Sequence, residues 1–380
     1  MHLKLPMNEA VSQIQLSGIR RFNALARQTP GCLSLTLGEP EFDTPEPIKQ
    51  AAVQSLEDNE THYPPNNGQD FLLEELSKFG HQRGLFYAPD EIIVTNGATE
   101  AIFCSLTALL NPGDEVIVPM PAFGLYEALI TLCRGKTVPL DTVPFDFQLD
   151  EAALRACITE HTKAIVLTSP NNPTGCVYTK ESLSAVAQVA GEYGIYILCD
   201  DVYHQMMYEG SCEAFGALFP HLRGQLIVID SFSKPYAMTG WRLGWLMADR
   251  EIKEQIQKVH QYSVVSVTSF TQRAAVEALH TDVTLMRCRY RERRDQVVRT
   301  LRAMDMDVVT PQGAFYAFPS IQKWGMTSEE FCTRLIQEAK LALVPGSCFG
   351  SEGFVRLSYC CSEEVLTEGL NRLYHFFKQL

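Results

Sequence analysis

The stretch LIVIDSFSKPYAMTGWRLG, residues 226–244, is more informative about the fold than any other part of this chain. It begins with four apolar residues, 226–229, which predict a short buried strand. Lys234 follows this strand, close behind the hydroxyl side chains of Ser231 and Ser233 and among aromatic residues. A lysine normally lies in solvent. A lysine placed directly after a buried strand therefore predicts a functional residue at the end of a sheet.

Five further apolar runs have the length and composition of strands. They alternate with helix-like segments such as 180–187, in which Leu183, Val186 and Ala187 share one face. The runs are Ile92 to Thr95, Val116 to Val118, Ala164 to Leu167, Ile195 to Cys199 and Leu243 to Met247. This alternation predicts an α/β fold with a mostly parallel sheet in the large domain. The pattern changes after about residue 270, so we expect a large domain over 41–265 and a smaller α+β lobe formed by 1–40 and 266–380.

Small and polar residues follow the other runs, where ligands bind in open α/β sheets, beyond the carboxyl ends of the strands. Small residues at 95–101 open a helix whose first N–H groups suit a phosphate. Phe123 offers a ring that can stack on a planar ligand. Asn172 lies in a Pro-Thr-Gly turn that leaves its amide free, and Asp200 directly follows a buried strand. A buried carboxylate normally has a cationic partner. These residues form one coherent set at one edge of the sheet.

The composition argues against several other functions. Lys and Arg total 32 against 45 Asp and Glu, a net charge of -13, which disfavours binding to nucleic acid or to an anionic membrane. The arginine-rich run 287–294 also contains Glu292 and predicts a solvated helix face. The twelve cysteines follow no recurring spacing and predict reduced thiols. No long apolar stretch follows Met1–Pro6, so we expect a cytoplasmic protein with no membrane segment and no metal site.

Several short motifs also occur in a recognisable order along nearly the whole chain. They are Gly38-Glu39-Pro40, Tyr63-Pro64-Pro65-Asn66-Asn67-Gly68, Asn172-Pro173-Thr174-Gly175, Ser231-Phe232-Ser233-Lys234 and Arg356-Leu357-Ser358. In this order they resemble the class I/II aminotransferases of pyridoxal-phosphate (PLP) fold type I. Three other strings are similar to the bacterial branch that includes aromatic and N-acetyl-diaminopimelate aminotransferases: Ser17-Gly18-Ile19-Arg20, Val259-His260-Gln261-Tyr262 and Gly313-Ala314-Phe315-Tyr316.

The resemblance implies which residues bind the cofactor, pyridoxal 5'-phosphate. Lys234 would hold it as a Schiff base, and Asp200 would pair with its pyridinium nitrogen. These two residues and Tyr203 would be the catalytic ones. The remaining cofactor contacts would be made by Asn172 and Tyr203 at the phenolic oxygen, by Phe123 at the ring face, and by Ala98, Thr99, Ser231, Ser233 and Arg242 at the phosphate.

The resemblance also implies the substrate contacts and the assembly. Arg356 matches the arginine that grips the α-carboxylate of the substrate, a planar anion suited to a bidentate guanidinium. Asn172 and the backbone at Gly38 would assist it. Tyr63 would reach the cofactor phosphate of the neighbouring subunit, so we expect a C2 homodimer with shared active sites.

The predicted function is therefore transfer of an amino group from an L-amino acid to a 2-oxo acid such as 2-oxoglutarate, by a ping-pong mechanism. The pKa of Lys234 must be lowered, by burial and by the nearby cationic Arg242, for its amine to act as a nucleophile. Thr99 stands where the similar bacterial aspartate aminotransferases often have a lysine for the distal carboxylate. We therefore expect an aromatic or long acyl-diamino donor in preference to aspartate. A PLP-dependent C–S lyase or another eliminating enzyme of the same fold is the alternative, because it shares the Schiff-base chemistry.

Overall fold

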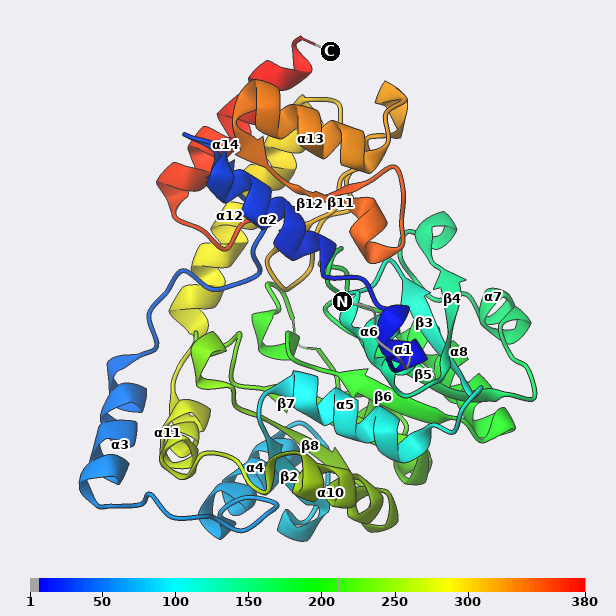
Figure 1. Cartoon of the computed structure of the whole chain (residues 1–380), viewed down its shortest axis with the longest axis vertical. Helices are drawn as coiled ribbons and strands as arrows, with labels where there is room; N and C mark the ends of the chain where they lie inside the picture. Colours follow the sequence, from blue (N-terminus) through cyan, green and yellow to red (C-terminus); the bar gives the residue numbers. More distant parts are fainter. Residues whose placement is uncertain (1–6, 211, 380) are drawn as a thin grey trace.

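The computed structural model describes residues 7–210 and 212–379, and its centre is a seven-stranded sheet (Figure 1). Met1–Pro6, part of the predicted small lobe, lie outside the described residues. The strand order is β2-β8-β7-β6-β5-β3-β4, and β8 runs antiparallel to both of its neighbours while the others are parallel. The strands are β2 (Ile92–Thr95), β3 (Glu115–Met120), β4 (Lys136–Asp141), β5 (Thr162–Thr168), β6 (Tyr196–Asp200), β7 (Leu226–Ser231) and β8 (Gly244–Ala248). All six predicted strands are present, and β4 is an additional edge strand.

Alternating side chains of the sheet pack into two separate cores. In β7, Leu226 and Val228 face one core while Ile227 and Ile229 face the other, as the two-residue period of a strand requires. The first core is covered by α3 (Glu46–Glu57), α4 (Asp70–Gln82), α7 (Glu151–Ala156), α8 (Lys180–Tyr193), α9 (Phe215–Leu218) and α11 (Ser269–His280). The second is covered by α5 (Ala98–Leu109), α6 (Leu125–Leu132) and α10 (Arg250–Val264). The sheet is therefore buried on both faces, as expected for a mostly parallel sheet.

A smaller lobe with a core of its own forms the upper part of Figure 1. Its antiparallel sheet has the order β11-β12-β9, and a second sheet pairs β1 with β10 in parallel. These strands are β1 (Leu33–Ser34), β9 (Tyr316–Ala317), β10 (Leu341–Ala342), β11 (Val344–Pro345) and β12 (Val355–Ser358). The helices are α2 (Gly18–Gln28), α12 (Thr284–Ala303), α13 (Ser328–Ala339) and α14 (Glu363–Phe377). Together with the large sheet, this lobe gives the predicted α/β architecture.

The boundary between the lobes stays a prediction, and the packing of α11 suggests where to adjust it. Val267 and the buried alanines of α11 belong to the core under the large sheet, and α11 lies against α3 and α4. We therefore propose that the large domain extends to about His280 rather than ending at residue 265. The short helix α1 (Glu9–Ser12) lies against α6.

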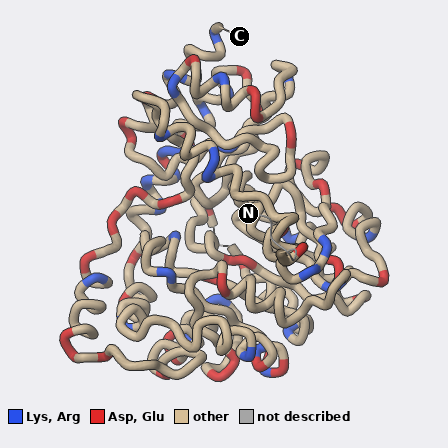
Figure 2. Tube along the Cα trace, in the orientation of Figure 1, with Lys and Arg blue, Asp and Glu red and all other residues tan. Residues whose placement is uncertain are grey.

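The arginine-rich run lies in α12, as predicted, but one of its arginines is buried. Arg294 is only 4% exposed, and its guanidinium donates to Glu209, Asp295 and the carbonyl of Pro311. The predicted solvated face is therefore wrong at Arg294, because two of its three partners, Glu209 and Pro311, lie outside α12 and hold the guanidinium against the rest of the protein. In Figure 2, basic and acidic residues are interspersed along the trace. Within the described residues, every helix is too short or too polar to cross a membrane.

Candidate active site

The predicted site residues gather beyond one edge of the large sheet. Thr168, Asp200 and Ser231 are the last residues of β5, β6 and β7, and these parallel strands end side by side. Because β8 runs in the opposite direction, its beginning lies at the same edge, which brings in Arg242, two residues before β8. The start of α5 at Ala98 also lies there, since it follows the end of β2.

Lys234 lies three residues beyond β7, and its amine is held inside the site. Its Nζ donates a hydrogen bond to the carbonyl of Gly38 at 2.7 Å, and the side chain is half-buried. Burial lowers the pKa of Lys234 to about 8; the nearby cations Arg356 and Arg242 act in the same direction, and Cys360 opposes them. The lowered pKa and the contribution of Arg242 agree with the expectation from the sequence. An amine with this pKa is in part unprotonated at neutral pH and can act as a nucleophile or a base.

Asp200 is buried and only half satisfied. Its Oδ2 accepts a hydrogen bond from the Tyr126 hydroxyl at 2.6 Å, and that hydroxyl also lies 2.7 Å from Thr168 Oγ1. Its Oδ1 has no hydrogen-bond partner among the described residues. Burial raises the pKa of Asp200 to about 7, and the bond from Tyr126 opposes the rise. Among the described residues, no lysine, arginine or histidine forms an ion pair with Asp200, and Arg83 pairs with the adjacent Asp201 at 2.6 Å.

An unpaired, buried carboxylate oxygen is a site that requires a donor. The protonated ring nitrogen of PLP is such a donor, and its charge would favour the ionised form of Asp200. The residues present thus fit the ring end of the cofactor.

The predicted phosphate cup is built from the first turn of α5 and the Arg242 guanidinium. Gly97 precedes α5 with a φ of 77°, and a Cβ at this position would lie 2.6 Å from Arg242 Nη2. Gly244 allows an equally close approach, since a Cβ there would lie 2.9 Å from the amide nitrogen of Ala98. The open N–H groups at the start of a twelve-residue helix, beside a guanidinium, fit a phosphate dianion.

Two of the three hydroxyl residues predicted for the cup lie at the end of β7 or just beyond it. Ser231 and Ser233 are both buried, and Ser231 Oγ accepts a hydrogen bond from the Ser233 amide at 3.1 Å. Thr99, in the first turn of α5, is exposed. Ala98, Thr99 and Ser231 thus lie in the elements that meet here, Arg242 lies just before β8, and Ser233 is joined to Ser231; their contacts to a phosphate stay a prediction.

Arg356 is a buried cation without a carboxylate partner among the described residues. It lies in β12 and is 2% exposed; Nη1 donates to Asn172 Oδ1 at 2.8 Å and Nη2 to the Thr36 carbonyl at 2.5 Å. Its Nε has no hydrogen-bond partner in the part of the chain that the structure describes, and the guanidinium lies over the rings of Tyr316 and Phe349, 4.5 and 4.8 Å from their centres. Burial lowers its pKa. A buried, incompletely paired guanidinium is suited to capture an anion.

Two phenols adjoin this arginine. The hydroxyls of Tyr203 and Tyr316 are 2.8 Å apart, and both side chains are buried. Burial raises the pKa of Tyr316 to about 12. A Cβ at Gly38 would overlap the Tyr316 hydroxyl at 1.8 Å, so only glycine allows the backbone to pass there. The predicted substrate contacts Gly38, Asn172 and Arg356 are thus brought together.

Two predicted residues lie at the margin of the site. Phe123 is half-buried with its ring edge-on to Tyr126, the ring centres being 6.4 Å apart. Tyr63 is 88% exposed. An exposed tyrosine is compatible with the predicted contact to a neighbouring subunit.

Sequence reasoning assigned no role to several residues that the structure places in the site. Tyr126 was visible as an aromatic residue after the second predicted strand, and Tyr316 as part of a motif, yet neither pattern showed that their hydroxyls would meet Asp200 and Tyr203. Cys360 Sγ donates to the Leu37 carbonyl at 3.2 Å, next to Gly38. Nothing in the spacing of the cysteines indicated this position.

Comparison with known proteins places this geometry in context. A family model described as "Aminotransferase class I and II" matches residues 30–373. The "Probable N-acetyl-LL-diaminopimelate aminotransferase" of Bacillus subtilis is 41% identical, covering 97% of this chain and 94% of that protein. "Aromatic-amino-acid aminotransferase 2" of Thermococcus litoralis is 37% identical over 99% of each chain. The solved structure of the Thermus thermophilus aspartate aminotransferase with maleate is 36% identical, with a TM-score of 0.93 over 98% of this chain and 99% of that one. The resemblance seen in the sequence is confirmed.

Proposed function

This chain belongs to the class I and II aminotransferases, PLP-dependent enzymes of fold type I, and on that premise we propose its specific reaction. It transfers the amino group of an L-amino acid to a 2-oxo acid, with 2-oxoglutarate as acceptor, by a ping-pong mechanism. The observation that carries the proposal is a pair of incompletely satisfied buried groups, Asp200 Oδ1 and Arg356 Nε. Within residues 7–210 and 212–379, Asp200 Oδ1 lacks a hydrogen-bond donor and Arg356 Nε lacks an acceptor. A protonated cofactor ring would supply the donor, and a substrate carboxylate would supply the acceptor.

The bound cofactor supplies an electron-withdrawing ring that stabilises negative charge developing at the substrate Cα. Asp200 would hold its ring nitrogen, and Lys234 would bind it covalently. The other contacts would be made by Ala98, Thr99, Ser231, Ser233 and Arg242 at the phosphate, by Asn172 and Tyr203 at the phenolic oxygen and by Phe123 at the ring face.

Lys234 is the residue of this chain that moves the proton. With a pKa of about 8, its free amine is basic enough to take the proton from the substrate Cα and, once protonated, acidic enough to release it again. Its hydrogen bond to the Gly38 carbonyl keeps Nζ at the mouth of the site before substrate binds. Asp200 assists by remaining ionised when it faces a positive charge.

Arg356 orients the substrate. Its guanidinium is fixed by Asn172 and by the Thr36 carbonyl, so an α-carboxylate meets a cation that is already immobilised. The flanking Tyr316 and Phe349 exclude water around it, which strengthens the ion pair. The Cα of the substrate is thereby held at a fixed place relative to Lys234.

Thr99 determines our expectation for the donor. It is an exposed, short neutral side chain at the start of α5 and offers no cation to a distal carboxylate. Loss of one charge-assisted hydrogen bond corresponds to about 1.5–3 kcal/mol, or about ten- to a hundredfold in discrimination. We therefore expect an aromatic or long acyl-diamino donor to be preferred over aspartate.

The deciding measurement is kcat/KM for aspartate, phenylalanine, tyrosine, methionine and N-acetyl-diaminopimelate with 2-oxoglutarate fixed. In a separate series with one donor, varied at several concentrations of 2-oxoglutarate, parallel lines in double-reciprocal plots are expected for a ping-pong mechanism. A lead of tenfold or more for aspartate would overturn the donor assignment. Turnover of cysteine conjugates without any 2-oxo acid would favour the eliminating enzyme instead.

The assembly and the location are proposed on separate grounds. The exposed Tyr63 is expected to lie in the neighbouring active site of a C2 homodimer, and sedimentation of a fully active monomer would contradict this. All twelve cysteines are free thiols, which supports a reducing compartment and hence the cytoplasm.

A further inference from the structure

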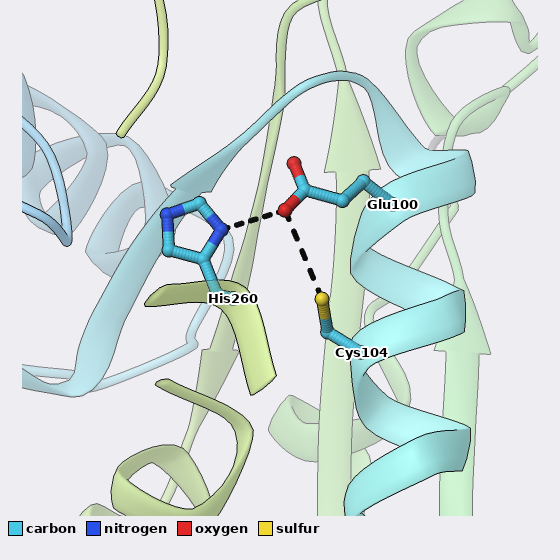
Figure 3. Close-up of side chains that lie close together, drawn as sticks. All are labelled: Glu100, Cys104 and His260. Carbon is cyan, nitrogen blue, oxygen red and sulfur yellow. Dashed lines mark hydrogen bonds and ion pairs between the residues drawn. The ribbon is translucent and has the colours of Figure 1, made fainter. Parts of the chain in front are cut away.

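A buried cluster of three side chains lies behind the phosphate cup, outside the set of predicted cofactor contacts. Glu100 and Cys104 are one turn apart on α5, and His260 approaches them from α10 (Figure 3). His260 and Cys104 are fully buried, and the Glu100 side chain is 10% exposed. Burying an imidazole and a carboxylate together requires that their hydrogen bonds be satisfied.

The hydrogen bonds of this cluster fix the position of its protons. His260 Nε2 lies 2.8 Å from the Asn66 carbonyl, which can only accept, so Nε2 must carry a proton. His260 Nδ1 lies 2.7 Å from Glu100 Oε1, and Cys104 Sγ lies 3.7 Å from the same oxygen. One further proton therefore lies between the ring and the carboxylate. Whichever atom carries it, the two side chains form one hydrogen-bonded pair.

The same distances argue against a metal ion at this place. Two ligand atoms at about 2.0–2.1 Å from a tetrahedral zinc would be separated by about 3.3 Å. The separation of 2.7 Å between His260 Nδ1 and Glu100 Oε1 is that of a direct hydrogen bond. His260 Nε2 is already bound to a backbone carbonyl.

The second carboxylate oxygen connects the pair to the phosphate cup. Glu100 Oε2 accepts a hydrogen bond from the backbone amide of Asn96 at 2.5 Å. Asn96 directly precedes Gly97, and its own carbonyl lies 3.5 Å from Arg242 Nη2. Glu100, in the first turn of α5, thus holds the backbone of Asn96, and Asn96 lies just before the helix start that would bind the phosphate.

On the other side, the pair is anchored to the segment that carries Tyr63. His260 holds the carbonyl of Asn66, three residues beyond Tyr63, and the next carbonyl, that of Asn67, accepts from the Val94 amide of β2 at 2.9 Å. The imidazole therefore joins the Asn66 segment to the turn between β2 and α5. Both segments are fixed relative to α10 by one side chain.

We propose that the His260–Glu100 pair is a positioning element for the cofactor phosphate: it holds the Asn96–Gly97 turn, and through it the start of α5 and the Arg242 guanidinium, in the geometry that binds the phosphate. This inference rests on the proposed function only in requiring that PLP binds. Neither residue is among the proposed cofactor contacts; the contacts of the pair go to the backbone at Asn96 and Asn66.

The test compares Glu100→Met with Glu100→Gln in the full-length enzyme freed of cofactor. A glutamine can accept from the Asn96 amide with its oxygen and donate to His260 Nδ1 with its nitrogen, so it restores both contacts, whereas methionine restores neither. The probes are PLP, inorganic phosphate as its competitor, and pyridoxal, which lacks the phosphate. Cys104→Ala is the matched control, because it removes a buried neighbour of the same carboxylate but no contact to the cup.

We expect Glu100→Met to weaken PLP and inorganic phosphate by at least tenfold while pyridoxal binding changes less than threefold. Glu100→Gln and Cys104→Ala should stay within threefold of the wild type for all three probes. Equal weakening of PLP and pyridoxal, or unchanged PLP affinity in a folded Glu100→Met variant, would overturn the proposal. So would a Glu100→Gln variant that fails as badly as Glu100→Met.

If Glu100→Met does not fold, the affinities for PLP, inorganic phosphate and pyridoxal are measured with the double variant Glu100→Met, His260→Phe instead. It removes the unpaired imidazole together with its partner, and replacing both members of a buried polar pair is tolerated better than removing one. It should fold and still lose the phosphate-specific affinity, and retention of that affinity would refute the positioning role. A wild-type protein that binds no PLP would instead contradict the proposed function itself.

Discussion

The lowered pKa of Lys234 predicts a pH profile that can be measured on the cofactor-free enzyme. With a pKa of about 8, about 9% of the Lys234 amine is unprotonated at pH 7, against about 0.04% for an ordinary lysine with a pKa of about 10.4. The structure thus predicts about a 200-fold larger nucleophilic fraction at neutral pH. The cause is burial of the amine at the end of β7, with two arginines nearby.

The sign of the pH effect follows from the same cause. Burial disfavours the charged ammonium, so the reactivity of Lys234 should rise about tenfold per pH unit below pH 8 and level off above it. An exposed lysine such as Lys78, whose pKa is raised by its hydrogen bond to Glu75, should still become more reactive at pH 10.

Competitive acetylation with trace acetic anhydride, followed by mass spectrometry of the peptides, measures both lysines in one sample. The folded protein should show an inflection near pH 8 for Lys234, and the same peptide in urea should inflect near the ordinary value of about 10.4. An inflection above pH 10 in the folded protein, or identical profiles with and without urea, would refute the reasoning about burial.

Three further outcomes are expected. Arg356→Lys should lower kcat/KM about ten- to a hundredfold, because a lysine cannot present two parallel donors to a carboxylate; an unchanged value would contradict its proposed role. Asp200→Asn should stabilise the cofactor-free protein at pH 8 by up to about 4 kcal/mol, because a buried carboxyl whose pKa is raised to about 7 destabilises the folded protein increasingly as the pH rises from about 4 to 7. Thermal unfolding at about pH 4 and at about pH 8 should show the gain at pH 8 alone. Arg83→Met should reduce the free energy of unfolding, measured in urea, by about 3–5 kcal/mol, because it leaves the buried carboxylates of Asp201 and Asp230 without the arginine that pairs with both. A loss below about 1 kcal/mol would show that other groups stabilise these carboxylates.

Much of the fold could be predicted because the central strands are buried on both faces. Such strands are continuous apolar runs that stand out in the sequence, as in β7 and β8, where every residue is buried. The strand β4 was missed because it lies at the edge of the sheet, and most of its side chains are exposed or half-buried. The direction of β8 was also hidden, since an apolar run carries no sign of whether it is parallel or antiparallel.

Site residues could be predicted from the sequence where a single residue next to a strand suggests a role. Contacts between side chains that are far apart in the sequence could not be predicted. Asp200 is the last residue of β6, and Lys234 and Asn172 lie a few residues beyond the ends of β7 and β5, so their positions could be inferred from local sequence. The bond from Tyr126 to Asp200 spans 74 residues, and no local pattern indicates it. The burial of Arg294 was missed for a similar reason, because its partner Glu209 lies far along the chain.

The position of β8 next to β2 constrains the order in which the large sheet can fold while the chain is being synthesised. The strand β2 ends at Thr95, but the neighbour with which it pairs, β8, begins only at Gly244. A nascent chain that has emerged from the ribosome as far as β7 therefore holds β2 without its partner, and the turn after β2 still lacks the guanidinium that precedes β8. Long-range pairing of this kind slows folding and leaves a strand edge open to wrong partners. The proposed phosphate cup is thus completed late in translation, when the antiparallel pair of β7 and β8 joins a strand made much earlier.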